Sequence, residues 1–321
     1  HLLYYIYIMT TSTYNIDFLK KLNTHSRDRH ISFYEPTHTY TILNDLGSKY
    51  TSVTTLIHTL FEQFNADNII RKMMLSKKWP TNKYFGMTTQ EIKNVWEINR
   101  VNAANMGTQL HYLIECFMNL GQFISNNSTN STNSTNNAHS FDFGSYNLGQ
   151  LLQYYFANPQ CLDGCKSIDF IVDNDFNYFI NFAQKFPNLI PFRTEWTIYE
   201  EDLKLSGSID MLFKDEYGKF HIYDWKRSKE IVKTKSWLQF STSDKISHIP
   251  DTNYWHYCLQ LNIYKRILKN KYDIDIDSWG IPALSGYAFN SPNALAYKTL
   301  ITQEMLKKGY LAVNSVYVCT E

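Results

Sequence analysis

Two acidic residues and one lysine lie close together at the ends of two short apolar runs. Residues 205–210 read Leu-Ser-Gly-Ser-Ile-Asp and end in Asp210, and a second run ends in an Asp-Trp-Lys triplet at 224–226. Residues 215–218 between them have the composition of a short hairpin turn. Two carboxylates and an ammonium at one sheet edge can hold a divalent cation and position a water against a phosphodiester.

Side-chain alternation supports this arrangement. Residues two apart on a strand share a face, so Phe220, Ile222, Asp224 and Lys226 are expected to point the same way. Charges that continue a buried face are costly unless they are paired or bound to a metal. The alternative is a surface ion pair, and a second Asp-x-Lys triplet at 202–204 lies in a charged run that is typical of an exposed turn.

An apolar-periodic helix around residues 106–117 carries His111 and Glu115 one turn apart on one face. Gly107 is expected to let this helix start close against another backbone. The alternative interpretation is a core histidine that is hydrogen-bonded to Glu115.

Three further polar residues lie near the hairpin in the sequence. Glu195 lies in an apolar segment over 192–199, which predicts a strand directly before the hairpin. Gln260 and Tyr264 are one turn apart on a helix expected over 253–270. Taken alone, these residues would be an edge-strand glutamate and the polar fringe of a helix.

Together these residues resemble the PD-(D/E)xK nuclease superfamily, in its RecB-like exonuclease branch with viral and phage members. The resemblance covers about residues 105–270, and Ile209 stands where the superfamily name has its proline. Four motifs occur in the expected chain order: Gly107 to His111, Gly207 to Asp210, Asp224 to Lys226, and Gln260 to Tyr264.

The resemblance implies a restriction-endonuclease-like core and a site for Mg²⁺ or Mn²⁺, cations that prefer oxygen ligands. The implied metal ligands are His111, Asp210, Asp224 and the backbone carbonyl of Trp225. Lys226 would position the attacking water and lower its pKa. The other implied catalytic residues are Gln260 and Tyr264, which would contact the lysine, the phosphate or the strand, and Glu195, which would hold a metal-bound water or orient a ligand. Glu115 would hydrogen-bond to His111 and orient its ring toward the metal.

The implied activity is hydrolysis of DNA phosphodiester bonds by an exonuclease acting in replication, recombination or repair. A structure-specific endonuclease on the same fold and a catalytically inactive nucleic-acid-binding module are the alternatives. In a third alternative, a structural protein, the same polar residues would merely cap the sheet edge.

Charge is balanced over the whole chain but not locally. The 321 residues include 31 Lys and Arg against 30 Asp and Glu, which argues against affinity for DNA through bulk charge. A basic run follows the Asp-Trp-Lys triplet, and it is expected to lead a phosphate backbone to the site or, alternatively, to form a solvated loop. Its residues after Lys226 are Arg227, Lys229, Lys233 and Lys235, with Glu230 the single acid.

The pattern of elements predicts an α/β or α+β fold in which helices flank a mixed central sheet. We expect a hairpin over 31–50, helices over 52–120 with a break at Trp79-Pro80, helices over 145–185, three strands over 192–227 and a helix over 253–270. The expected divisions are a tail (1–30, suspected to be non-native before Met9), an N-terminal part (31–124), an Asn/Ser/Thr insertion (125–140), a nuclease core (141–272) and a C-terminal segment (273–321) of uncertain origin.

Five scattered cysteines and the lack of a membrane-length apolar window favour an intracellular protein that is not secreted. The cytoplasm or nucleus of a host cell, or a viral factory, would fit. The last 45 or so residues resemble a fragment of class III, PLP-dependent aminotransferases, but they include no recognisable Schiff-base lysine, so no such activity is inferred.

Overall fold

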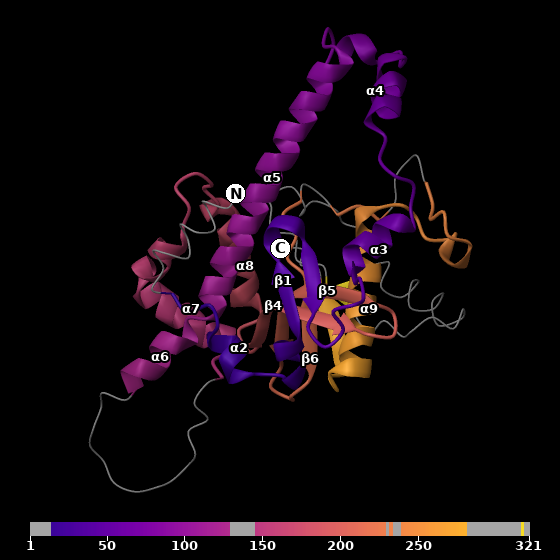
Figure 1. The fold of residues 1–321 in the computed structure, drawn as a ribbon. Coiled ribbons are helices and arrows are strands. Elements are labelled where there is room, and N and C mark those ends of the chain that lie inside the picture. Colours follow the sequence, from indigo (N-terminus) through magenta and orange to yellow (C-terminus); the bar gives the residue numbers. More distant parts are fainter. Residues whose placement is uncertain (1–13, 129–144, 229–230, 234–238, 281–315, 318–321) are drawn as a thin grey trace, which may run out of the picture.

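The computed structural model describes residues 14–128, 145–228, 231–233, 239–280 and 316–317. In these residues a two-stranded hairpin stands beside a six-stranded mixed sheet (Figure 1). The hairpin strands are β1 (Ile31–Tyr34) and β2 (Thr39–Ile42). The sheet strands are β3 (Thr51–Ser52), β4 (Ile190–Glu200), β5 (Leu205–Lys214), β6 (Phe220–Tyr223), β7 (Ile276–Gly280) and β8 (Val316–Tyr317). The α+β class with a mixed central sheet is therefore confirmed.

Strand β5 is the centre of the sheet. It pairs antiparallel with β4 along its whole length. On its other edge it pairs with β3 through Leu205 and Ser206, and with β6 from Met211 onward. Between these two partners, none of the described strands lies beside 207–210 on that edge, and this opening receives the candidate site described below.

Helices cover both faces of the sheet (Figure 1). The α-helices are α2 (Phe18–Leu22), α3 (Val53–Thr59), α4 (Ala66–Met74), α5 (Thr89–Met118), α6 (Gly121–Ser128), α7 (Leu148–Ala157), α8 (Asp173–Lys185) and α9 (Asn253–Lys271). Short 3-10 helices are η1 (Ser26–His30), η2 (Glu35–Thr37), η3 (Trp79–Thr81), η4 (Pro159–Cys165) and η5 (Asp244–Ile246). Because alternate strand residues face opposite sides, each face buries its own hydrophobic core.

The two cores join different helices to the sheet. One core includes Val53 of α3, Ile222 of β6 and Leu261 of α9, together with residues of the β1–β2 hairpin. The other includes Phe117 of α5 and Trp225, together with residues of α2, α7 and α8. Since neighbouring residues of the chain near 222–225 belong to opposite cores, the backbone after β6 is fixed from both sides.

A buried ion pair attaches the N-terminal segment to β4. The Arg193 side chain is 3% exposed, and its Nη1 lies 2.7 Å from the Asp28 Oδ2 atom. Trp196 Nε1 donates to the other Asp28 oxygen at 2.8 Å, and the Arg193 guanidinium lies over the Trp196 ring. Arg193 is thus buried together with the carboxylate of Asp28, which compensates its charge, because an unpaired buried ion would be costly.

Helix α5 extends well beyond the motif helix expected around residues 106–117. It begins at a capping box made by Thr88 and Glu91 and continues for 30 residues to Met118. Gly107 therefore lies inside the helix, and the expectation that the helix starts there is wrong. A Cβ atom at Gly107 would meet no atom within 4 Å, so close backbone packing is not the reason for the glycine either.

The other expected elements are present with small shifts. The hairpin over 31–50, the break at Trp79-Pro80, the helices over 145–185 and the helix over 253–270 are confirmed. The three strands run from Ile190 to Tyr223, so Asp224 and Lys226 follow the last strand rather than lying on it. Helix α6 ends at Ser128, and the rest of the Asn/Ser/Thr insertion lies outside the described residues. Of the C-terminal segment, the structure describes β7, which pairs parallel with β6, and β8. Within the described part, no helix is long and apolar enough to cross a membrane.

Replacing Asp28 by Asn tests the buried ion pair. The variant would leave the Arg193 charge buried without a counter-charge, which should lower the free energy of unfolding by about 3 kcal/mol at pH 7. Urea denaturation followed by tryptophan fluorescence measures the change. Glu97→Gln, which removes an exposed partner of Arg100, should leave the denaturation midpoint unchanged.

The same ion pair predicts a pH dependence. Burial raises the pKa of Asp28, but its bonds to Arg193, His25 and Trp196 lower it overall. A carboxyl with a depressed pKa in the folded state adds stability above its ordinary pKa, and this stability is lost as the pH falls below about 4. The difference between the wild type and Asp28→Asn should therefore shrink below about pH 4, and a constant difference would contradict this account.

Candidate metal centre

The open edge of β5 brings Asp210 and Asp224 together. Tyr223, the last residue of β6, pairs with Met211, so the next residue of the chain comes level with Asp210. The backbone N–H of Trp225 donates to Asp210 Oδ2 at 2.8 Å. The hairpin turn is closed by a hydrogen bond from Gly218 N to Asp215 O, as its composition predicts. Local strand pairing alone therefore places the two carboxylates at one sheet edge.

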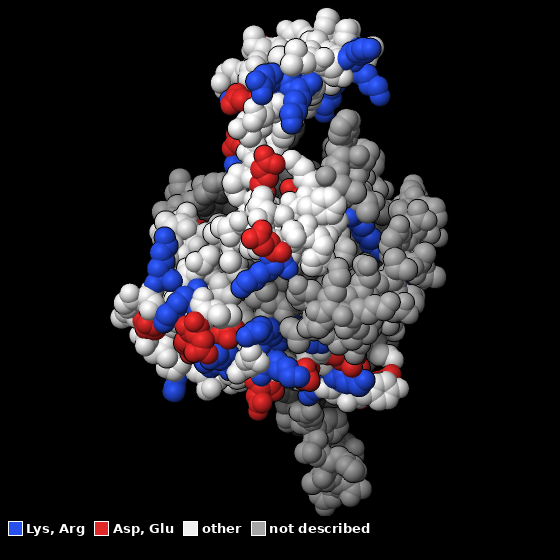
Figure 2. Space-filling view, turned by 90° about the vertical axis from the view of Figure 1, so that its right-hand side faces the viewer, with Lys and Arg blue, Asp and Glu red and all other residues white. Residues whose placement is uncertain are grey.

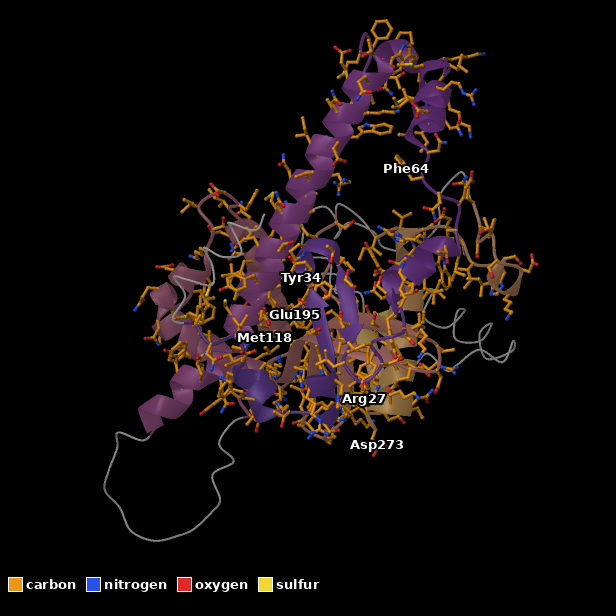
Figure 3. All side chains as sticks on the ribbon, viewed as in Figure 1. Arg27, Tyr34, Phe64, Met118, Glu195 and Asp273 are labelled. Atoms are coloured by element: carbon orange, nitrogen blue, oxygen red, sulfur yellow. The ribbon has the colours of Figure 1, made fainter. Side chains whose placement is uncertain are left out.

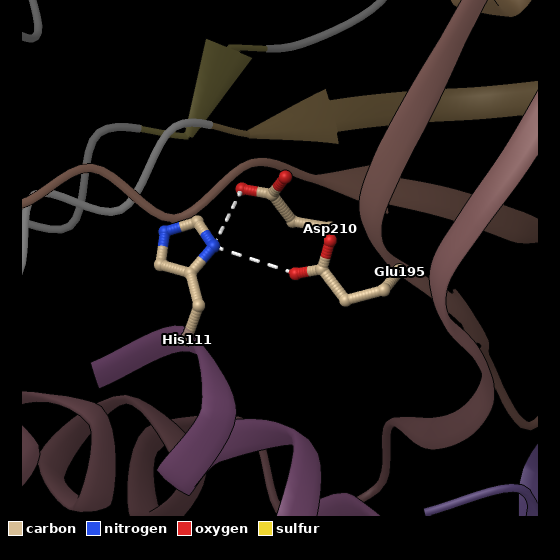
Figure 4. A group of neighbouring side chains, drawn as sticks. All are labelled: His111, Glu195 and Asp210. Atoms are coloured by element: carbon tan, nitrogen blue, oxygen red, sulfur yellow. Dashed lines mark hydrogen bonds and ion pairs between the residues drawn. The ribbon is translucent and has the colours of Figure 1, made fainter. Parts of the chain in front are cut away.

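His111 reaches this edge from the last third of α5 (Figure 4). Its Nε2 lies 3.0 Å from the backbone carbonyl oxygen of Trp225. Its Nδ1 lies 3.4 Å from Glu195 Oε1 and 3.8 Å from Asp210 Oδ2. One ligand atom from each of these three side chains lies within 4.8 Å of the other two, a separation that a single metal ion can bridge after small adjustments.

Glu195 has an unusual backbone conformation. Its φ of 41° is in the left-handed region, which costs energy for a residue with a side chain. The flanking pairs, Thr194 with Met211 and Trp196 with Ile209, place Glu195 across from Asp210 on β5. Figure 4 shows both carboxylates directed toward the imidazole. A strained residue at this point indicates that the position of the carboxylate matters more than ideal strand geometry.

Lys226 lies against Asp224. The lysine Nζ is 2.7 Å from Asp224 Oδ2, and it also lies over the ring of Tyr257 on α9. Gln260 donates to the other Asp224 oxygen at 3.3 Å and lies 3.4 Å from the Tyr264 hydroxyl. Helix α9 thus contributes three neighbouring side chains, of which Tyr257 was missing from the predicted set. Its place one turn before Gln260 is the feature that indicates a shared face.

The site carries more negative charge than its surroundings can solvate. Burial raises the pKa of Asp224 to about 6, although the charge of Lys226 opposes the shift. Burial likewise raises the pKa of Asp210. For His111, burial lowers the pKa, but Asp210 and Glu195 outweigh this effect and raise it to about 9. The carboxylates therefore attract positive charge to the site, whether as protons or as another cation.

Glu115 is less directly connected to His111 than the sequence analysis predicts. It lies one turn further along α5, and Thr194 Oγ1 donates to it at 3.3 Å. Burial, followed by repulsion from Glu195, raises the pKa of Glu115 to about 8. In the described part of the chain, the imidazole of His111 forms hydrogen bonds with the Trp225 carbonyl and with Glu195. Glu115 is not among these described partners.

The basic residues after Lys226 either contact other side chains of the protein or lie outside the described residues. Arg227 forms a 2.7 Å ion pair with Asp175 of α8. Lys233 is half-buried over the ring of Tyr254, and burial lowers its pKa. Lys229 and Lys235 lie outside the described residues. The structure thus groups His111 and Asp210 with Glu195, whereas Asp224 lies against Lys226 and Gln260, and the Trp225 carbonyl lies at the other imidazole nitrogen. Arg227 is already neutralised by an acid.

Comparison with protein-family models, with curated proteins and with solved structures gives no match. The function is therefore argued from the residues of the site.

The two motif glycines should respond oppositely to replacement by alanine. A Cβ at Gly207 would lie 2.6 Å from Tyr264 Cε1 and 2.7 Å from its hydroxyl oxygen, so Gly207→Ala should displace the ring. We expect a loss of about 1–3 kcal/mol of unfolding free energy. Gly107→Ala places a methyl group in open space inside a helix and should add about 1 kcal/mol. Urea denaturation of both variants measures these changes, and equal effects would show that the packing against Tyr264 is not the cause.

Proposed function

We propose that this protein is a metal-dependent DNA nuclease with a restriction-endonuclease-like core. The observation that carries the proposal is the convergence of an imidazole, three carboxylates and a lysine from separate segments of the chain. His111 comes from α5, Glu195 from β4, Asp210 from β5, and Asp224 and Lys226 from the segment after β6.

The donor set fits Mg²⁺ or Mn²⁺. Asp210 and Glu195 offer oxygen atoms beside the Nδ1 atom of His111, and the Trp225 carbonyl lies at the other ring nitrogen. The Asp224 side chain, 2% exposed, lies next to Lys226 at the same sheet edge. Oxygen ligands with at most one imidazole are the set that these hard cations accept. The raised pKa values of Asp210 and Asp224 support the fit, because a bound cation would stabilise both ionised carboxylates.

The residues of the chain then have distinct roles. The ammonium of Lys226, held beside Asp224, is placed to orient a water and to stabilise negative charge that develops on a phosphate. Gln260 holds the second Asp224 oxygen, and Tyr264 holds Gln260 in turn. Glu195 lies beside Nδ1 of His111, on the same side of the ring as Asp210, and can orient a water or a ligand. A bound cation would supply Lewis-acid polarisation of the scissile phosphate.

DNA is the proposed substrate, and an exonuclease acting in replication, recombination or repair is the proposed form. An endonuclease would use the same residues, and an inactive module would bind DNA without hydrolysing it. The three differ in their products rather than in the geometry of the site.

Incubation with end-labelled linear DNA and with circular DNA, each as single and double strands, tests the proposal. We expect release of mononucleotides from ends with Mg²⁺ or Mn²⁺, and no product with EDTA. Asp224→Asn and Lys226→Met should each lower the rate by about a thousandfold or more, because each removes a group that acts on the reacting atoms.

A matched pair of control variants is available in the other Asp-x-Lys triplet. Asp202 pairs with Lys271, and Lys204 pairs with Asp45, away from the site. Asp202→Asn and Lys204→Met should retain full activity. Nicking of circular DNA would favour the endonuclease, binding without cleavage would favour the inactive module, and unchanged cleavage by Asp224→Asn would exclude the mechanism.

A further inference from the structure

A helical arm stands out from the body of the protein (Figure 1). It consists of α4, the connection through η3, and the first half of α5. Ile70 and Ile92 are fully buried within it, and Lys93 pairs with Asp67 at 2.6 Å across the two helices. Between the arm and the body, most of α5 from Glu97 to Ala104 is exposed. We call residues 68–90 at the end of the arm the arm tip.

The arm tip carries positive charge without acids. Residues 68–90 include five Lys and Arg and neither Asp nor Glu. All five are exposed, and Figure 2 shows basic side chains gathered at the end of the arm. They are Arg71, Lys72, Lys77, Lys78 and Lys83.

The nearby acidic side chains are occupied elsewhere. Asp67 pairs with Lys93, Glu91 caps the start of α5, Glu97 pairs with Arg100, and Glu62 accepts a hydrogen bond from Gln239. Among the described residues, no ion pair involves any of the five arm-tip cations. Such a surface attracts a polyanion through long-range electrostatics and through release of its counterions.

Exposed apolar side chains lie among these cations. Leu75 is 80% exposed and Phe85 is 57% exposed, with the Phe85 ring packed edge-on against Trp79. Phe64, which is also exposed, lies where the chain leaves the body for the arm (Figure 3). Aromatic rings beside lysines suit an unpaired strand, whose bases can stack on them while its phosphates contact the ammonium groups. A duplex would offer its phosphates but not the faces of its bases.

Helix α5 connects the arm tip to the candidate metal centre. The helix runs without a break from Thr89 to His111, a distance of about 33 Å at the usual rise of about 1.5 Å per residue. A stacked strand rises about 3.4 Å per nucleotide along its axis, so about ten nucleotides would cover this distance. The geometry therefore fits one strand that contacts the arm tip and the metal centre together.

We propose that the arm tip binds the backbone and bases of an unpaired DNA strand whose scissile end lies at the candidate metal centre. This inference rests on the proposed nuclease function and adds its substrate class. The arm supplies affinity for the strand about ten nucleotides away from the scissile bond, and the centre supplies the chemistry.

Binding measured without catalysis separates the two proposals. The probe is a fluorescein-labelled oligothymidylate of about 30 nucleotides, titrated with the full chain in EDTA and followed by fluorescence anisotropy. A variant with Lys77, Lys78 and Lys83 replaced by Gln should bind at least tenfold more weakly. The slope of log affinity against log salt should fall by about 2, because each lost phosphate contact contributes about 0.7 for a single strand.

Two matched controls distinguish the arm from general charge and general hydrophobicity. Replacing Lys20, Lys21 and Lys49 by Gln removes the same charge from exposed positions of the body and should change affinity less than twofold. Phe85→Ser should weaken binding about fivefold or more through lost stacking, whereas Phe156→Ser on α7, with a ring 54% exposed, should not.

Substrate length gives a test that uses activity. With Mg²⁺, the arm variant should cleave strands of about 30 nucleotides more slowly than the wild type, but strands of about four nucleotides at the wild-type rate, because these are too short to reach the arm. If the arm variant binds the strand more weakly but the wild type cleaves no DNA, the result supports the proposal for the arm and overturns the proposed nuclease function.

Three results would overturn the proposal for the arm. The arm variant could bind the single strand as tightly as the wild type, or it could lose as much affinity for blunt duplex DNA as for the single strand. The arm could also bind anionic lipid vesicles in place of DNA.

Discussion

Mutual repulsion of buried carboxylates is the constraint on which the site depends. Asp210 and Asp224 lie at one sheet edge where little water can solvate them, and Glu195 adds a third acid beside the same imidazole. Lys226 and a protonated His111 balance part of this charge. The fold therefore maintains an arrangement that favours the capture of a cation, and it maintains this at a cost to its own stability.

Packing in the two hydrophobic cores on either face of the sheet offsets this loss of stability. Ile222 packs on one side, Tyr223 and Trp225 pack on the other, and the segment carrying Asp224 is held between them. The opening on the β5 edge is equally important, because it lets the Trp225 backbone N–H donate to the Asp210 side chain instead of continuing the strand pairing. Interrupted pairing, rather than a flexible loop, makes room for the polar cluster.

The local part of this arrangement could be predicted from the sequence. Alternation and turn composition predict that Asp210 and Asp224 meet at one sheet edge, although Asp224 directly follows β6. Helical spacing predicts Gln260 beside Tyr264, and both patterns depend on near neighbours. The approach of His111 depends on how α5 packs across the sheet, and only the family resemblance suggested it. The positive φ of Glu195 has no counterpart in the sequence pattern. The arm was missed because the amphipathic pattern of two helices packed on each other resembles that of helices packed on a core, and a glycine inside a long helix resembles a helix start.

The continuity of α5 also fixes a rotational phase between the arm and the imidazole. An α-helix turns by about 100° for each residue, so the direction in which the arm tip faces is set by the number of residues that precede His111. One residue gained or lost in the exposed stretch between them would swing the lysines well to one side, whereas seven would return them to within about 20°. The number of residues between the arm tip and His111 therefore sets the direction in which the arm tip faces as well as its distance from the imidazole.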